Sequence, residues 1–187
     1  GARLPLERDL NLHTLWPEVG KLFGHDTELQ CLAASEEEEG GRMVASAARA
    51  REAKDAVVRV WDARSGECLD VLEGGHRSTV AALGFSSDNA FLASAGKDRR
   101  LCIWRRRPAA EGRGFVLAAA ADRAHKRIVW GLDWRAAPDA ALPHVLATGS
   151  RDGSVKIWTV VEDPSGGAFL QERHRFEPAG GEPAVTA

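Results

Sequence analysis

Apolar and polar residues alternate with period two in three short stretches that lie far apart in the chain. The stretches read "VVRVWD" at 57–62, "LCIWRR" at 101–106 and "VKIWTV" at 155–160. This alternation places every second side chain on one face, which predicts a half-buried β-strand. A run of small residues containing Ser46, Ser94 or Thr148 precedes each stretch. We expect each run to be the hairpin partner of the strand that follows it.

The three stretches are copies of one repeat, because an aspartate precedes a tryptophan by six positions in each. The pairs are Asp55 and Trp61, Asp98 and Trp104, and Asp152 and Trp158. The second and third copies align without a gap, whereas the first carries five extra residues before its aspartate. The tryptophans follow one another at intervals of 43 and 54 residues.

Each copy also has a histidine upstream and two further apolar stretches. The histidines are His25, His76 and His125. The stretches after them read "ELQCLAAS", "TVAALGF" and "IVWGLDW", and those before them read "VGKLF", "ECLDVL" and "GFVLAAA". Four short strands per unit, repeated at this spacing, are typical of the blades of a β-propeller.

The dipeptides Gly24-His25 and Trp61-Asp62 make the chain resemble the WD-repeat family over residues 16–176. The second and third copies keep the tryptophan but lose the aspartate that follows it. The resemblance implies an all-β fold, with about three four-stranded blades that are a fragment of a larger propeller. We expect a linker at 1–15 and a partial propeller at 16–187, with blades near 25–75, 76–122 and 125–176 and the start of a further blade.

In this family, the His, Ser or Thr, Asp and Trp of one unit form a hydrogen-bonded network that fixes the blade. Carried over to the matching positions, the resemblance implies the networks His25–Ser46–Asp55–Trp61, His76–Ser94–Asp98–Trp104 and His125–Thr148–Asp152–Trp158. Ser, His and Asp also form acyl-transfer triads, which need an exposed serine beside an oxyanion hole. The threefold recurrence, closed each time by tryptophan, favours the structural interpretation. We expect no catalytic residue.

Three stretches go beyond the generic repeat: "TLWPEVGKLFGHDTE", "KDRRLCIW" and "HKRIVWGLDW". In this order they resemble the second propeller of the tandem-propeller subunit family of the Elongator complex. That resemblance implies a non-catalytic scaffold supporting wobble-uridine modification of transfer RNA. The implied partners are the large scaffold subunit and the catalytic subunit, in the cytoplasm with the nucleus as a second location. The alternatives are another WD-repeat adaptor, such as a ubiquitin-ligase substrate receptor, an RNA-binding module and, last, a hydrolase.

Composition and charge argue against several classes of function, among them metal binding and insertion into a membrane. The formal net charge is −2, so no global field favours nucleic acid or a membrane surface. Cys31, Cys68 and Cys102 lack zinc-ligand spacing and are odd in number, which favours free thiols in a reducing compartment. No apolar run is long enough to span a bilayer. We expect no metal, cofactor, membrane or small-molecule substrate.

Two groups of side chains are candidates for contact with a partner or with RNA. Arg99 and Arg100 precede the second strand stretch, and the cluster of Arg105, Arg106 and Arg107 ends it. A strand separates the two clusters, so we expect solvated or protein-contacting arginines rather than one phosphate-binding patch. Trp130 is extra to the repeat, and we favour packing between blades over a partner anchor. Trp134 aligns with Phe85 and is predicted to lie in the core.

Overall fold

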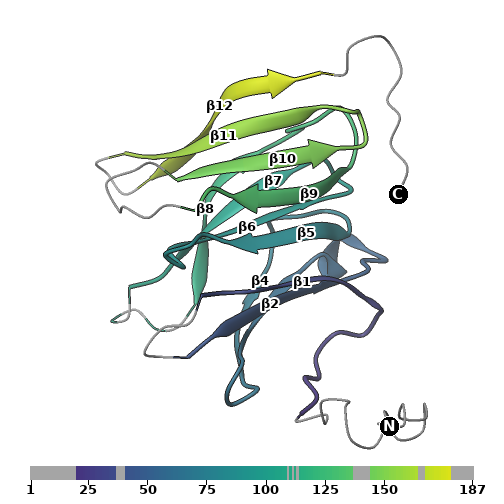
Figure 1. Ribbon diagram of the computed structural model, residues 1–187. Helices are drawn as coiled ribbons and strands as arrows, with labels where there is room; N and C mark the ends of the chain where they lie inside the picture. The colour runs from purple at the N-terminus through teal and green to yellow at the C-terminus, as the bar shows by residue number, and fades with distance from the viewer. Residues whose placement is uncertain are drawn as a thin grey trace, which may run out of the picture.

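The computed structural model describes residues 20–36, 41–108, 110, 112, 114–136, 144–163 and 167–177. The predicted linker at 1–15 and the predicted further blade after 177 lie outside these residues. The described part forms three four-stranded antiparallel sheets, and it contains the 3₁₀ turn Ala53–Asp55 and no α-helix. The prediction of an all-β, blade-like architecture is confirmed. Figure 1 shows the three sheets side by side in chain order, from the purple first strand to the yellow last one.

Each sheet is built from four strands consecutive in sequence, so every connection is a local hairpin. The first sheet comprises β1 (Leu29–Ala34), β2 (Met43–Ala48), β3 (Val58–Asp62) and β4 (Cys68–Leu72). The second comprises β5 (Val80–Phe85), β6 (Phe91–Gly96), β7 (Leu101–Arg106) and β8 (Phe115–Ala121). The third comprises β9 (Val129–Trp134), β10 (Val145–Ser150), β11 (Val155–Glu162) and β12 (Ala168–Phe176).

One predicted strand is absent. The described residues 20–23 of the "VGKLF" stretch form no strand, and Leu22 and Phe23 are exposed. The first sheet instead takes its fourth strand from "ECLDVL", which pairs with β3 as β4. The stretch "AFLQERHRF" forms β12, the outer strand of the third sheet. Each unit therefore takes its outer strand from the residues that follow its tryptophan, not from those before its histidine.

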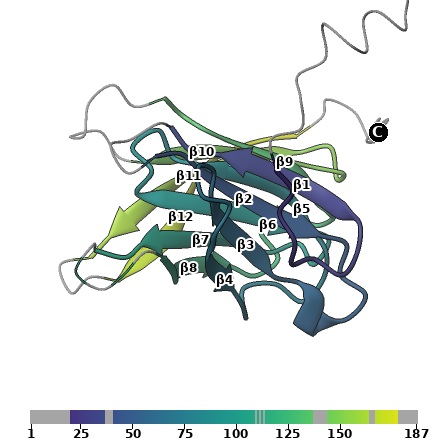
Figure 2. The same ribbon diagram turned by 90° about the horizontal axis from the view of Figure 1, so that it is seen from below.

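The core lies between neighbouring sheets, whose facing side chains interdigitate. Between the first and second sheets, Val58 and Val60 belong to the same buried cluster as Leu92 and Trp104. Between the second and third sheets, the buried cluster is made by Phe91, Leu101, Ile103, Val129, Trp134, Leu146 and Trp158. Figure 2, seen from below, shows that the sheets cross one another with a twist rather than lying flat. Burial of these side chains supplies the main driving force for packing one sheet on the next.

A β-bulge recurs at the same place in all three sheets. The register between the third and fourth strands shifts immediately before the repeat tryptophan: at Val60/Trp61, Ile103/Trp104 and Ile157/Trp158. The first and second strands of each sheet also pair with a register shift. A bulge raises the local twist, so the three sheets acquire similar curvature at equivalent positions.

Polar contacts join neighbouring sheets at their edges. The N–H of Ala50 donates to Thr79 Oγ1 (3.1 Å), and the N–H of Phe115 donates to Asp70 Oδ2 (2.8 Å). His144 Nε2 lies 2.8 Å from Asp88 Oδ2. These contacts fix the relative position of sheets that packing alone would leave free to slide. No helix in the described ranges has the length and apolarity needed to cross a membrane.

Candidate functional site

The second sheet holds a complete four-residue network. His76 Nε2 lies 2.8 Å from Ser94 Oγ, and its Nδ1 lies 3.0 Å from Asp98 Oδ2. The indole N–H of Trp104 donates to the same serine oxygen (2.8 Å). The strands position these groups, because Ser94 on β6 lies beside Cys102 on β7, two residues before Trp104. All four residues expected in this unit are therefore hydrogen-bonded together.

The buried carboxylate keeps His76 protonated. Burial alone lowers the pKa of an imidazole, but the Asp98 hydrogen bond and the adjacent Cys102 sulfur overcome it and raise the pKa of His76 to about 9. Burial opposes ionisation of Asp98, yet His76 and the N–H groups of Arg77 and Arg100 hold the pKa of that carboxyl below its usual value. The pair is thus a charged, buried ion pair with its remaining acceptor capacity filled by backbone donors.

The third sheet builds its network differently. His125 Nε2 lies 2.8 Å from Thr148 Oγ1, which also accepts from the Trp158 indole N–H (2.8 Å). The closest hydrogen-bond partner of Nδ1 is Ser154 Oγ (3.0 Å), and Asp152 lies farther away at 3.5 Å. Ser154 Oγ–H donates to Asp152 Oδ1 (2.5 Å). Ser154 is a network member that the sequence did not reveal, because Asp-Gly-Ser is typical of any turn.

The inserted hydroxyl changes the charge state of the histidine. Burial lowers the pKa of His125 below its ordinary value, and Lys156 adds to that effect while Asp152 only partly opposes it. Burial opposes ionisation of Asp152, but the Ser154 hydroxyl and the N–H groups of Ser154 and Lys126 donate to its carboxylate and hold its pKa far below the usual range. His125 is therefore neutral where His76 is charged.

The first sheet keeps three of its four expected members. His25 Nε2 lies 2.8 Å from Ser46 Oγ, and the indole N–H of Trp61 donates to that oxygen (2.7 Å). The prediction for Asp55 is wrong: its Oδ2 accepts from the N–H of Glu52 (3.0 Å) as part of a capping box on the 3₁₀ turn Ala53–Asp55. Among the described residues, no hydrogen bond joins Asp55 to His25. The five extra residues fold into this turn and remove the carboxylate from the histidine.

None of the three hydroxyls has the geometry of a nucleophile. Ser94 is fully buried, Thr148 is 1% exposed and Ser46 is 6% exposed. Each accepts from a tryptophan N–H that lies over it. An attacking hydroxyl needs open access and oxyanion donors, so the arrangement supports the structural interpretation of these residues. No group of histidine, cysteine or acidic residues in the described ranges is arranged to hold a metal ion.

The candidate arginines Arg99 and Arg100 are neighbours in sequence but differ in exposure and in their contacts. Arg99 is exposed in the turn between β6 and β7, in the left-handed conformation (φ 65°). Arg100 points inward: its Nη1 donates to the carbonyl of Gly75, and its Nε lies 2.6 Å from Asp122 Oδ1. The expectation that Arg100 contacts a partner is therefore corrected, because its guanidinium is committed within the chain.

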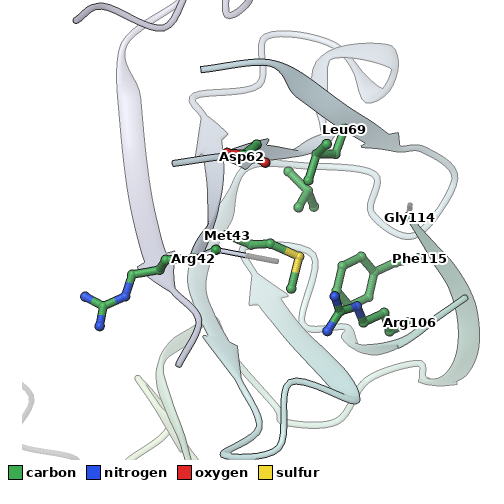
Figure 3. A pocket seen from close by; sticks show the side chains of 9 residues that line it. Arg42, Met43, Asp62, Leu69, Arg106, Gly114 and Phe115 are labelled. Carbon is green, nitrogen blue, oxygen red and sulfur yellow. The ribbon is translucent and has the colours of Figure 1, made fainter. Parts of the chain in front are cut away.

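The other arginine cluster lies at the opposite end of β7. Arg105 and Arg106 are half-buried, whereas Arg107 is exposed. Figure 3 shows Arg106 beside Phe115 at a small pocket between the first and second sheets, with Met43, Leu69 and Asp62 opposite. The pocket holds only about 40 Å³, enough for little more than a water molecule. We therefore assign it no ligand.

Arg99 contributes to a strongly basic recess between the second and third sheets. The recess has a volume of about 350 Å³, and its lining residues are Arg99, Arg123, His125, Lys126, Lys156 and Arg175. Lys156 pairs with Glu172 and Arg175 pairs with Glu177. In the described part of the chain, no carboxylate pairs with the side chains of Arg99, Arg123 or Lys126. The sequence did not reveal this recess, because turns and strands distant in the chain supply its residues.

The two extra tryptophans of β9 differ in burial. Trp134 is 8% exposed and donates its indole N–H to the carbonyl of Gly84 on β5 (2.8 Å), which confirms its prediction as a core residue. Trp130 is 40% exposed. This exposure contradicts the expected burial between blades. An exposed tryptophan suits a contact with a partner, since interface centres favour this residue type.

The repeat matches a known protein family. The sequence matches the WD40 family (WD domain, G-beta repeat) over residues 66–105 and 118–159. Residues 66–105 and 118–159 are thus WD40 repeats. The WD40 sheets are similar to the solved structure of U3-55K, with 25% identity, a TM-score of 0.60, and coverage of 84% of this chain and 41% of that one. Hsv2 from Kluyveromyces lactis gives a TM-score of 0.61 at 13% identity, over 82% of this chain and 49% of its own.

The WD40 repeats are also similar to one named subunit across eukaryotes. Elongator complex protein 2 of Saccharomyces cerevisiae is 35% identical over 89% of this chain, and that of Arabidopsis thaliana is 36% identical over 85%. The protein of that name from Mus musculus is 34% identical over 82%. The chain spans about a fifth of the length of these relatives. The three sheets therefore match only a part of each of these relatives.

The second-sheet ion pair predicts a loss of stability at alkaline pH. The folded pKa of His76, about 9, lies above its ordinary value of 6.5. Its contribution is therefore complete below about pH 6.5 and disappears as pH rises through 9, with a size of about 3 kcal/mol. Urea unfolding between pH 6 and pH 10 should show this decline in wild type and a flatter profile in His76→Gln. His125→Gln should keep the decline, since the folded pKa of His125 is lowered instead.

The two aspartates predict unequal costs of the same chemical change. Asp98→Asn leaves the buried His76 imidazolium without its counter-charge, and we expect a loss of about 3 kcal/mol in unfolding free energy. Asp55→Asn should change stability by less than about 0.5 kcal/mol, because an asparagine oxygen also accepts from the N–H of Glu52. Urea midpoints at pH 7 measure both. Equal losses would contradict the assignment of Asp98, and not Asp55, to a network.

Proposed function

We propose that this chain is part of a non-catalytic scaffold subunit of the Elongator complex. The observation that carries the proposal is the 33–36% identity to Elongator complex protein 2 from yeasts, plant, amoeba, insect and vertebrates, over at least 82% of the chain. In this proposal, the chain contributes blades near 25–75, 76–122 and 125–176 to a larger propeller. Its partners are the large scaffold subunit and the catalytic subunit, in the cytoplasm with a nuclear pool.

The arrangement of side chains supports a scaffold rather than an enzyme. The hydroxyl groups that resemble a hydrolytic triad lie buried beneath tryptophans, where they hold strands together. The exposed Trp130 and the exposed Arg107, which follows β7, offer contact surfaces. A scaffold supports wobble-uridine modification by holding the catalytic subunit and its transfer RNA in a productive arrangement.

Removal of the protein is the direct test of this role. Deletion of its gene should abolish wobble-uridine modification of transfer RNA, although the chain supplies no reactive group. Mass spectrometry of modified nucleosides measures the outcome, and co-purification of the catalytic subunit with the large scaffold subunit reports assembly. Ser46→Ala should reduce modification only in proportion to the loss of protein. Normal modification in the deletion strain would refute the Elongator assignment and leave the general WD-repeat adaptor.

A second candidate function is direct contact with transfer RNA, and the basic recess favours it. Five cationic side chains surround one concavity, and in the described part of the chain no carboxylate pairs with Arg99, Arg123 or Lys126. A phosphate backbone satisfies such a group by displacing counterions, which gives sequence-independent binding. This contact is compatible with the scaffold role, because a scaffold that positions the substrate also touches it.

Salt dependence distinguishes this contact from protein-only assembly. The double variant Arg99→Glu, Lys126→Glu should weaken transfer RNA binding at least about 10-fold. It should also lower the slope of log K against log salt by about 1.5, since two phosphate contacts are lost. The double variant Arg51→Glu, Arg64→Glu, at exposed positions of the first sheet, is the control with the same change in net charge. If both variants bind transfer RNA equally, the recess does not contact the backbone.

A further inference from the structure

The three networks differ at one position, and the difference leaves a polar cleft in the first sheet. The second and third sheets each place a carboxylate near the Nδ1 atom of their histidine, at 3.0 Å from Asp98 and 3.5 Å from Asp152. In the first sheet the corresponding carboxylate of Asp55 accepts from the N–H of Glu52 instead. The first sheet can therefore be compared directly with the other two: they contain a carboxylate near the histidine, and it does not.

A local insertion accounts for the difference. Ser46 precedes Asp55 by nine positions, whereas four positions separate Ser94 from Asp98. The added residues form the 3₁₀ turn Ala53–Asp55, which Glu52 caps. In Figure 2 this turn is the short blue coil at the end of the first sheet, away from its centre. In the other two sheets a tight turn brings an aspartate to the histidine, whereas the longer turn of the first sheet leaves Asp55 bonded to Glu52.

A guanidinium stands at the inner end of this opening. Arg59 on β3 occupies the position that Lys156 takes in the third sheet, four residues after the aspartate. Lys156 has Glu172 as its partner at 2.7 Å. Arg59 Nε is buried, and within the described part of the chain it has no hydrogen-bond partner. A buried donor on a charged group is costly to leave unpaired.

The positive charge of Arg59 affects the pKa of His25. Burial lowers the pKa of His25, and Arg59 lowers it further, while Asp26 and the Ser46 contact only partly oppose them. His25 is therefore neutral, as expected for an imidazole that faces a cation instead of a carboxylate. The opening thus combines the unpaired Nε atom of Arg59 with the neutral imidazole of His25, whose Nε2 atom contacts Ser46.

The opening is large enough for a side chain. It has a volume of about 380 Å³, and besides His25 and Arg59 its charged lining residues are Asp26, Arg51, Glu52, Lys54, Asp55 and Glu73. Lys54 and Glu52 pair with each other at the rim (3.0 Å). The rim carries the carboxylates of Asp26, Glu52, Asp55 and Glu73 against the cations of Arg51 and Lys54. This excess of negative charge repels a polyphosphate such as RNA far more strongly than a ligand with one carboxylate flanked by neutral backbone.

We propose that this cleft binds an acidic side chain of a protein partner, whose carboxylate pairs with Arg59 and His25 and replaces the carboxylate that the first sheet lacks. A guanidinium binds carboxylate through charge-assisted hydrogen bonds, which are among the strongest in proteins. The blade would then become complete only when the partner is bound. The proposal rests on the first sheet alone, so it stands or falls separately from the Elongator assignment.

A peptide titration of the full 187-residue chain tests the site. The probe is acetyl-Gly-Ser-Glu-Ser-Gly-amide, with the glutamine peptide of the same length as its uncharged match. The His25 imidazole resonance, identified from its loss in His25→Gln, should shift with the glutamate peptide and not with the glutamine peptide. Peptide binding should also raise the pKa read from that resonance, because the carboxylate offsets the charge of Arg59.

Matched variants identify the responsible cation. Arg59→Gln should weaken glutamate-peptide binding at least about 10-fold, whereas Arg51→Gln, which removes one exposed charge from the rim, should change it less than about 3-fold. An unshifted Trp61 indole N–H resonance shows that Arg59→Gln preserves the network. Equal shifts with both peptides, no shift at millimolar peptide, or retained binding in Arg59→Gln would each overturn the proposal.

Discussion

A single buried side-chain oxygen in each sheet holds the blade together. The hydroxyl of Ser46, Ser94 or Thr148 joins a tryptophan N–H from the next strand to an imidazole from the loop before the sheet. An indole N–H has no alternative partner in an apolar interior, so removing the hydroxyl leaves two polar groups unpaired at once. This requirement fixes the register between the second and third strands and ties the histidine loop down. The packing of one sheet on the next then follows from that register.

The group that faces the imidazole on the side away from the hydroxyl differs between the three sheets. This group determines whether the histidine is charged. A direct carboxylate makes His76 a cation, an intervening Ser154 leaves His125 neutral, and a neighbouring Arg59 does the same for His25. The three blades therefore share a hydrogen-bond scaffold but not its electrostatics. The folded-state pKa of the histidine is raised in the second blade and lowered in the other two, so their contributions to stability change with pH in opposite directions.

Sequence predicted the parts of this molecule that depend on local periodicity. Alternating apolar residues located the strands, and the Asp-to-Trp spacing located the repeat, because both follow directly from strand geometry. Asp55 was misassigned, since spacing to Trp61 is preserved while the inserted turn rotates the carboxylate away. "VGKLF" was misassigned because the first sheet already had its four strands, so the apolar run had no partner. The basic recess was invisible because its residues come together only through the stacking of two sheets.

The recurring bulge beside each repeat tryptophan separates the outer strand from the rest of its sheet. The outer strands have five residues in β4, seven in β8 and nine in β12, yet the inner three strands keep comparable lengths. Because the bulge absorbs the change of register, additions to the outer strand do not propagate inward. The rim of each blade can thus diversify in length and chemistry during evolution while the tryptophan side stays constant. Variation among related blades is expected to accumulate at the periphery, where it alters recognition without threatening the fold.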